Sequence, residues 1–319
     1  MIVAVVYNPV RVDVPRVRAA VEAAAAQGDG VELLWLPTTV EEGGQAQARE
    51  ALDRGATLVL AAGGDGTVRA VAEALRGQDA TLAVIPGGTG NLLARNLGIP
   101  FGSVEAACAV AFGGETRRID AGVAAARYPD GSRSEHAFLV MAGIGIDAAM
   151  IAGARPELKR RFGWLAYVDA AFRTWPSATE VRVRFRLDRG HERSAHVSTI
   201  LIANCGALPG NIELIPDTAI DDGLLDVAIL QPATVFGWLA IWRKVTWENR
   251  VLRRSALGRR IIRFTDRAVR TRLSYLRGAS VQVKVDAPEP FELDGDAFGD
   301  VVGLDFSVDE LALRVKVPA

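Results

Sequence analysis

Two short glycine-rich runs, each following an apolar segment, hold the residues best suited to chemistry. The run Gly63-Gly64-Asp65-Gly66-Thr67 follows apolar residues 57–62, and Pro86-Gly87-Gly88-Thr89-Gly90-Asn91 follows 82–85. Glycines permit positive φ and a close approach of backbone to a ligand, and the helix-like segments behind both runs would present helix N-termini to phosphate groups. The pattern favours a phosphate pocket, and a pair of purely structural turns is the alternative.

The first part of the chain alternates short apolar strands with amphipathic, alanine-rich helices. We predict strands at 2–7, 31–36, 57–61 and 82–85, and helices near 14–26, 44–54, 68–76 and 104–112. This alternation implies right-handed crossovers and a parallel sheet with helices on both faces. Parallel neighbours end at the same sheet edge, so both glycine runs are expected to meet where open α/β sheets bind ligands.

Beyond Asp120 the pattern changes to strand-like runs with alternating apolar positions. Strands are predicted at 137–141, 181–187, 197–202, 225–230 and 281–285, with turns at 129–131 and 188–190. This pattern favours an antiparallel sandwich or barrel. Residues 304–317 are again strand-like and are expected to return to the first domain. The predicted domains are therefore 1–122 plus 305–319, and 123–304.

The composition limits the cellular setting. Half of the 319 residues are hydrophobic, enough for a sizeable core and suggestive of two domains. Cys108 and Cys205 are not in a metal-ligand spacing, so we expect no zinc site and a reducing compartment. Residues 1–9 lack the features of a signal peptide, and no apolar stretch reaches the roughly 20 residues that span a bilayer. We expect a cytoplasmic protein that associates peripherally with the inner face of the membrane.

Six motifs occur in an order that resembles a known family. They are Asn8-Pro9, 63–67, 86–95, 143–148, 222–226 and Asp294-Gly295-Asp296. The chain resembles, over nearly its whole length, the soluble bacterial diacylglycerol kinases, which are lipid kinases related to sphingosine and ceramide kinases. One glycine motif alone would be shared with NAD kinases and phosphofructokinases. The resemblance implies a three-layer α/β nucleotide-binding domain, an antiparallel β-sandwich-like domain, and an active site in the cleft between them.

The same resemblance implies that ATP binds at the glycine runs and two neighbouring turns. Backbone amides and threonine hydroxyls would donate to phosphate oxygens, while the glycines clear space. Thr38 is the alternative to its neighbour Thr39. The expected ATP-binding residues are Asn8, Pro9, Thr39, Gly63, Gly64, Asp65, Gly66, Thr67, Gly88, Thr89 and Asn91.

The turn at Asp222-Gly223-Leu224 resembles the family's structural magnesium site. The carboxylate of Asp222 and the backbone carbonyls of Ala219 and Leu224 would bind the ion. Such hard oxygen ligands suit Mg²⁺. A simple turn-forming Asp-Gly is the alternative.

The family's catalytic base is the glutamate of a late Asp-Gly-Glu motif, where this chain has Asp294-Gly295-Asp296. Aspartate reaches roughly 1.5 Å less far, at a site that requires a heavy-atom approach of about 2.6 to 3.2 Å. We expect Asp296 to be the base and Asp294 a supporting carboxylate or the alternative base. Asp65 is expected near the phosphates, acting through magnesium or water. An ordinary hairpin turn at 294–296 is the alternative.

A basic, aromatic segment spans residues 236–277. It holds twelve Lys or Arg residues against two acidic residues, and three of the six tryptophans. Arginine attracts anionic headgroups and tryptophan settles at the bilayer boundary, so we hypothesise a peripheral contact with an anionic membrane. An ordinary amphipathic helix with core tryptophans is the alternative. We expect no nucleic-acid partner, because no nucleic-acid module accompanies the charge.

Together these features predict an ATP-dependent lipid kinase that uses Mg²⁺ and transfers the γ-phosphate to a lipid hydroxyl, with diacylglycerol as the default acceptor and phosphatidic acid as the product. A sphingoid- or ceramide-type kinase is the alternative. The 143–148 and 222–226 motifs argue against a NAD or sugar-phosphate kinase. Arg69-Ala70 stand where relatives commonly have Asn-Glu, which costs one polar nucleotide contact. That loss, together with Asp296, also suits a lipid- or nucleotide-binding pseudokinase. The sequence leaves open whether the protein forms a homodimer.

Overall fold

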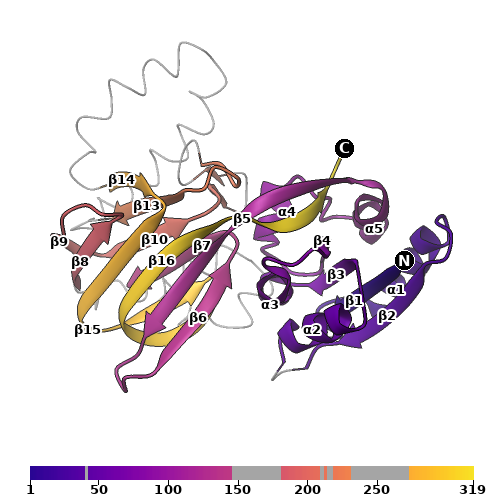
Figure 1. Ribbon diagram of the computed structural model, residues 1–319, viewed down its shortest axis with the longest axis horizontal. Helices are drawn as coiled ribbons and strands as arrows, with labels where there is room; N and C mark the ends of the chain where they lie inside the picture. Colours follow the sequence, from indigo (N-terminus) through magenta and orange to yellow (C-terminus); the bar gives the residue numbers. More distant parts are fainter. Residues whose placement is uncertain (40–41, 146–180, 209–211, 214–217, 231–272) are drawn as a thin grey trace, which may run out of the picture.

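The protein is described here from a computed structural model, which covers residues 1–39, 42–145, 181–208, 212–213, 218–230 and 273–319 (Figure 1). Its first part alternates strands and helices as expected. The elements are β1 (Ile2–Tyr7), α1 (Val14–Ala25), β2 (Glu32–Pro37), α2 (Gln45–Asp53), β3 (Leu58–Gly63), α3 (Asp65–Leu75), β4 (Thr81–Pro86), α4 (Leu92–Asn96) and α5 (Val104–Gly113).

These strands form a parallel sheet in the order β2-β1-β3-β4. Buried side chains of α1 and α5 pack on one face, and those of α2 and α3 pack on the other. Local signals fix the helix starts: Asp13 caps α1 by accepting from the Arg16 amide at 3.2 Å, and Ser103 caps α5 through the Ala106 amide. The expected three-layer α/β arrangement is confirmed.

The second part is built from strands. They are β5 (Glu115–Arg127), β6 (Arg133–Phe138), β7 (Met141–Gly145), β8 (Val181–Leu187), β9 (Arg193–Val197), β10 (Thr199–Ala203), β11 (Ala207–Leu208), β12 (Ile212–Glu213), β13 (Leu225–Leu230), β14 (Leu273–Gly278), β15 (Ser280–Leu293) and β16 (Asp296–Val317). They are antiparallel to their neighbours in this part, and β11 and β12 form a small separate pair. The other strands enclose an apolar core around Phe138, Phe291 and Phe306.

Strand β16 joins the two parts into one hydrogen-bonded sheet. It runs antiparallel to β15 and β5, and its residues Arg314 and Val315 then pair in parallel with Thr81 and Leu82 of β4. Figure 1 shows β5 and β16 passing side by side from the β-rich part to the α/β part. Near its end, the segment predicted to return to the first domain thus pairs with β4 of the parallel sheet. The predicted domain boundaries fall inside these two continuous strands, and that division stays a prediction.

Several of the predicted element boundaries are wrong, and the strand predicted at 281–285 is the longer β15. The expected strand 137–141 is two strands, because β6 ends at Phe138 and β7 begins at Met141. The expected strand 197–202 likewise breaks at Ser198, whose amide donates to the carbonyl of Leu230. Helix α3 begins at Asp65 rather than 68, so most of the first glycine run is already the first helical turn.

Candidate active site

The first glycine run places a helix start directly behind a buried strand. Gly64 is the extended residue between β3 and α3, and the Val68 amide donates to its carbonyl. A side chain at Gly63 would meet Thr67 at 2.7 Å, which explains glycine at the end of the strand. The amides at the start of α3 therefore lie at the carboxyl edge of the sheet, the position in which helix N-termini bind anions.

The second glycine run touches the first. A Cβ on Gly88 would lie 2.8 Å from the Cα of Gly64, so the backbone of the first run leaves no room for a side chain at Gly88. Asn91 has φ 48° and closes the second run on itself: its Oδ1 accepts from the Gly88 amide and its Nδ2 donates to the Gly88 carbonyl. Thr89 is exposed at the tip of this run.

The carboxylate of Asp65 ties the two runs together. One oxygen accepts from the Asn91 amide at 2.9 Å, and the other accepts from the Leu92 amide at the start of α4. Burial raises the pKa of Asp65, the two backbone amides act in the opposite direction, and the charge of Asp296 adds to the rise. Asp65 therefore shapes the pocket through contacts within the protein.

The turn behind β1 completes the same edge. The Asn8 amide donates to the Ala62 carbonyl at 2.9 Å, and Asn8 Oδ1 accepts from the Val10 amide. Val12 packs against Gly87 so closely that a Cβ there would lie 2.4 Å from its Cγ1. Asn8-Pro9 and both glycine runs therefore lie together at the ends of β1, β3 and β4, as the sequence predicts for an ATP site.

The two threonines behind β2 differ in their hydroxyl partners. Thr39 Oγ1 accepts from the Glu42 amide at 3.0 Å. Thr38 is 4% exposed, and within the described ranges its Oγ1 has no hydrogen-bond partner. A buried hydroxyl without a partner is available to a ligand. Of the two hydroxyls, that of Thr38 is thus the one left without a partner among the described residues.

The hairpin between β15 and β16 separates the two late aspartates. Asp294 is 5% exposed and its carboxylate accepts from the amides of Leu139, Val140 and Met141 at 2.8 to 3.0 Å. Burial raises its pKa to about 6, against the opposing effect of the three amides. Asp294 is thus an internal anchor. Asp296, whose side chain is 45% exposed, is the carboxylate that a substrate can reach.

Asp296 lies against the first turn of α3. Its Oδ2 is 2.5 Å from where a Cβ on Gly66 would be, and 3.8 Å from a terminal nitrogen of Arg69. Of the three expected catalytic residues, Asp65 and Asp296 are thus brought together around Gly66, although 231 positions separate them in sequence. The fold places a solvent-accessible carboxylate beside the amides at a helix N-terminus, which suits proton abstraction next to a bound phosphate.

The expected magnesium ligands Ala219, Asp222 and Leu224 lie in a separate turn before β13. Asp222 Oδ1 accepts from the Leu224 amide, and its Oδ2 is 3.4 Å from Arg277, which also makes a bidentate pair with Asp226. The oxygen donors have the right chemistry for Mg²⁺, but this carboxylate already carries a guanidinium partner. No group of three or more His, Cys, Asp or Glu side chains among the described residues is arranged to hold a metal.

Asp120 on β5 supports this turn and was not singled out by sequence reasoning. It is fully buried, and its carboxylate accepts from the Gly223 amide at 2.8 Å and from the Leu311 amide at 2.7 Å. Leu311 has φ 49° at the register shift of β16. Asp120 therefore joins three segments that are distant in sequence. A single aspartate at the start of an apolar run does not indicate such contacts in the sequence alone.

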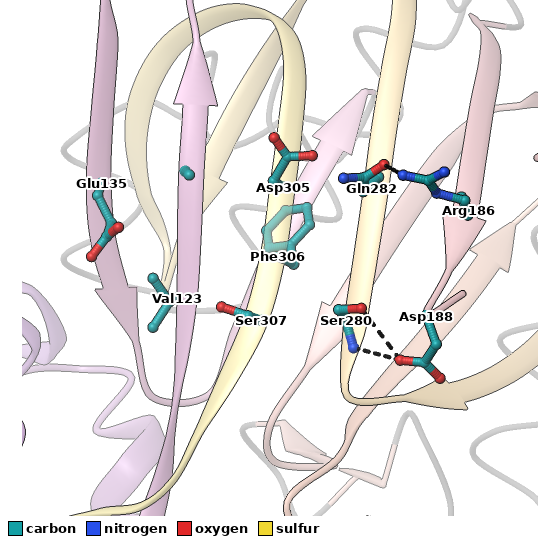
Figure 2. Close-up of a pocket in the computed structure, with 10 residues that line it drawn as sticks. Val123, Glu135, Arg186, Asp188, Ser280, Gln282, Asp305, Phe306 and Ser307 are labelled. Atoms are coloured by element: carbon teal, nitrogen blue, oxygen red, sulfur yellow. Dashed lines mark hydrogen bonds between the residues drawn. The ribbon is translucent and has the colours of Figure 1, made fainter. Parts of the chain in front are cut away.

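A shallow hollow of about 250 Å³ lies on the β-rich part, away from the glycine runs (Figure 2). A cross-strand row forms its floor, in which Ala125, Asp305 and Gln282 lie on neighbouring strands between Glu135 and Arg186. None of the expected site residues lines it. Polar residues that line the hollow bond to one another, such as Arg186 to Gln282 and Asp188 to Ser280. We therefore assign the hollow no part in the chemistry.

Comparison with known proteins agrees with this architecture. Residues 3–124 match the diacylglycerol kinase catalytic domain, and residues 140–317 match the YegS C-terminal NAD kinase beta sandwich-like domain. A probable lipid kinase YegS-like protein of Pseudomonas fluorescens is 32% identical over 310 residues, covering 95% of this chain and 90% of that protein. A diacylglycerol kinase of Bacillus subtilis is 31% identical over 66% of this chain and 67% of its own length.

Solved structures share the fold. A diacylglycerol kinase from Bacillus anthracis superposes with a TM-score of 0.72 at 20% identity, covering 99% of this chain and 96% of that one. Yeast NADH kinase superposes less well, with a TM-score of 0.52 at 9% identity, over 100% of this chain and 84% of its own. The chain belongs to the bacterial diacylglycerol kinase family of lipid kinases. Within the described residues, no helix is both long and apolar enough to span a bilayer.

Proposed function

We propose that the protein phosphorylates a lipid hydroxyl with ATP, and that diacylglycerol is the acceptor and phosphatidic acid the product. The observation that carries the proposal is the contact of Asp296 with Gly66 at the start of α3. It sets an accessible carboxylate beside backbone amides that suit a phosphate, and family membership supplies the reaction class.

The proposed mechanism uses few groups. The phosphates of ATP lie over the first turn of α3 and the Thr89 loop, where amide and hydroxyl donors offset their charge. The lipid hydroxyl oxygen attacks the γ-phosphorus, the bond to the β–γ bridging oxygen breaks, and ADP leaves. Asp296 accepts the hydroxyl proton. Asp65 holds the two glycine runs in register, so positioning and electrostatics supply most of the acceleration.

Magnesium, when bound with the nucleotide, would supply neutralisation of phosphate charge. The described residues offer oxygen donors for it, but Asp65 already accepts from Asn91 and Leu92. The membrane contact proposed for residues 236–277 lies outside the described residues except for 273–277. A lipid substrate nevertheless requires the protein to work at a bilayer surface, on the cytoplasmic side where ATP is found.

The test is to incubate the protein with γ-labelled ATP, magnesium and micelles that offer diacylglycerol, sphingosine, ceramide or no lipid. Labelled phosphatidic acid supports the proposal. Asp296→Asn should abolish it, whereas Asp79→Asn, at an aspartate whose side chain is 95% exposed, should not. Label on sphingosine or ceramide alone would replace the acceptor. ATP binding without any labelled lipid would instead indicate a pseudokinase.

A further inference from the structure

Arg69 stands one helical turn beyond Gly66 on α3, on the side that meets the hairpin of β15 and β16. Its side chain is only 12% exposed, and its terminal nitrogen lies 3.8 Å from Asp296 Oδ2. The other terminal nitrogen lies 3.5 Å from Glu73, four residues along the same helix. A largely covered arginine is therefore placed between a structural carboxylate and the expected base.

The guanidinium of Arg69 is held by more than charge. It lies over the ring of Phe298, 4.7 Å from the ring centroid, and Phe298 is the second residue after Asp296 on β16. That ring in turn packs against His136 and Phe291. Arg69 thus contacts β16 twice, once at the base itself and once beside it, and stacking on the ring favours the cation most strongly where water is excluded.

Glu73 fixes the other end of the arginine. Its carboxylate also accepts from Gln45 Nε2 at 2.9 Å and from the Ala137 amide at 3.2 Å. Its partners lower the pKa of Glu73 in spite of burial, with His136 the largest of them, followed by the Ala137 amide and Arg69. Glu73 is thus a fixed anion that sets where Arg69 lies.

One nitrogen of Arg69 is left over. Its Nε is buried and has no hydrogen-bond partner among the described residues. The carboxylates of Asp65, Asp294 and Asp296 lie near this point. The charge of Asp296 raises the pKa of Asp65, and the charge of Arg69 opposes the rise in the pKa of Asp294. A phosphate arriving beside them would be repelled unless a cation offset the charge.

We propose that Arg69 is a positioning residue for phosphoryl transfer, holding the short base Asp296 over the start of α3. The inference rests on the proposed function. The expected base is a short aspartate, and the arginine that stands one turn along α3 contacts it through a terminal nitrogen 3.8 Å from Oδ2. Proton transfer needs a close and well-directed approach, so a contact that holds the Asp296 carboxylate over the start of α3 would favour it.

The matched control is Arg76, at the end of the same helix. It also bridges elements, pairing with Glu135 at 3.0 Å and Asp309 at 3.7 Å. Arg69→Gln is expected to lower kcat about 30-fold or more while KM for ATP changes by less than about 3-fold, and Arg76→Gln to leave kcat within about 3-fold. Arg69→Lys, which keeps charge but not the fork, should recover part of kcat.

A double-mutant cycle separates positioning from a general loss of fold. Because Asp296→Asn alone is expected to abolish activity, the cycle is read on stability: if Arg69 holds Asp296, the Tm losses of Arg69→Gln and Asp296→Asn should be less than additive. Equal kcat losses in the Arg69 and Arg76 variants, or fully additive effects in the cycle, overturn the inference while leaving the kinase proposal standing. A wild type that labels no lipid overturns both.

Discussion

The carboxylate of Asp65 accepts a 2.9 Å hydrogen bond from the backbone amide of Asn91, across 26 residues of sequence. Together with the hydrogen bond from the Leu92 amide, this contact lets one carboxylate hold the two glycine runs together. The shape of the proposed phosphate pocket therefore depends on a group that need not touch phosphate. Loss of the Asp65 carboxylate should accordingly affect stability and activity together.

Asp65→Ala leaves the amides of Asn91 and Leu92 without an acceptor. Because unsatisfied buried donors cost about 1–3 kcal/mol, we expect the free energy of unfolding to fall by that amount. The second glycine run should shift, and kcat/KM should fall about 100-fold. Urea unfolding and the labelled-ATP assay measure the two effects. Wild-type values for both would contradict the assignment of Asp65.

Gly66→Ala separates activity from stability. The added Cβ would lie 2.5 Å from Asp296 Oδ2 and push the carboxylate aside, whereas alanine in place of helical glycine gains about 1 kcal/mol in propensity. We expect a folded protein of equal or higher Tm whose kcat falls about 100-fold. The control is Gly102→Ala, where a Cβ meets nothing within 4 Å. Full activity in Gly66→Ala would place the base elsewhere.

Asp294 should make stability depend on pH. Its pKa rises from 3.8 to about 6 on folding, so the folded protein holds this proton more tightly than the unfolded chain. The resulting stabilisation is present below about pH 4 and is lost as the pH rises to about 6, a change of about 3 kcal/mol. The difference in unfolding free energy between wild type and Asp294→Asn should follow this curve. A difference independent of pH would contradict it.

Chelation tests the predicted magnesium turn. If Mg²⁺ binds at Asp222, removing it with EDTA should lower Tm in the wild type and leave Asp222→Asn unchanged. The neighbouring Asp221, which pairs with Arg117, gives the matched control Asp221→Asn, whose response to EDTA should be that of the wild type. If EDTA leaves the Tm of the wild type unchanged, Arg277 alone neutralises Asp222.

The basic segment 236–277 predicts binding to anionic vesicles. Replacing Arg253, Arg254, Arg259 and Arg260 with glutamine removes attraction worth about 1 kcal/mol each near a charged surface. Vesicle sedimentation should show binding weakened at least about tenfold, and the loss should shrink at high salt. Unchanged sedimentation would favour an ordinary amphipathic helix.

The fold could be predicted wherever local pattern decides it. Strands β8 and β13 have the predicted bounds, because alternation or a continuous apolar run is bounded by turn residues. The break between β6 and β7 could not be predicted. Leu139 and Val140 are buried and apolar like the strands beside them, and what bends the chain is a carboxylate more than 150 residues later. Only the folded structure shows such a partner.

The candidate site likewise has parts that the sequence predicts and parts that only the structure shows. The glycine runs carry their chemistry in their residue types, so their meeting at one sheet edge could be predicted from strand order. The contact of Asp296 with Gly66, and the anchoring of Asp294 by 139–141, depend on long-range packing that the motif alone does not show. Thr38 was not preferred over Thr39, because only the structure shows which hydroxyl has a partner.

Strand β16 has a consequence for the order in which the molecule can assemble. Until Arg314 and Val315 pair with β4, the parallel sheet of the first domain has an open edge, and β5 lacks its longest neighbour. An open edge invites pairing with other chains, and contacts between such distant residues form slowly. Because β16 follows β4 in the chain by more than 200 residues, this edge of the parallel sheet stays open during synthesis until β16 has been made, which makes the half-finished sheet a candidate for chaperone protection.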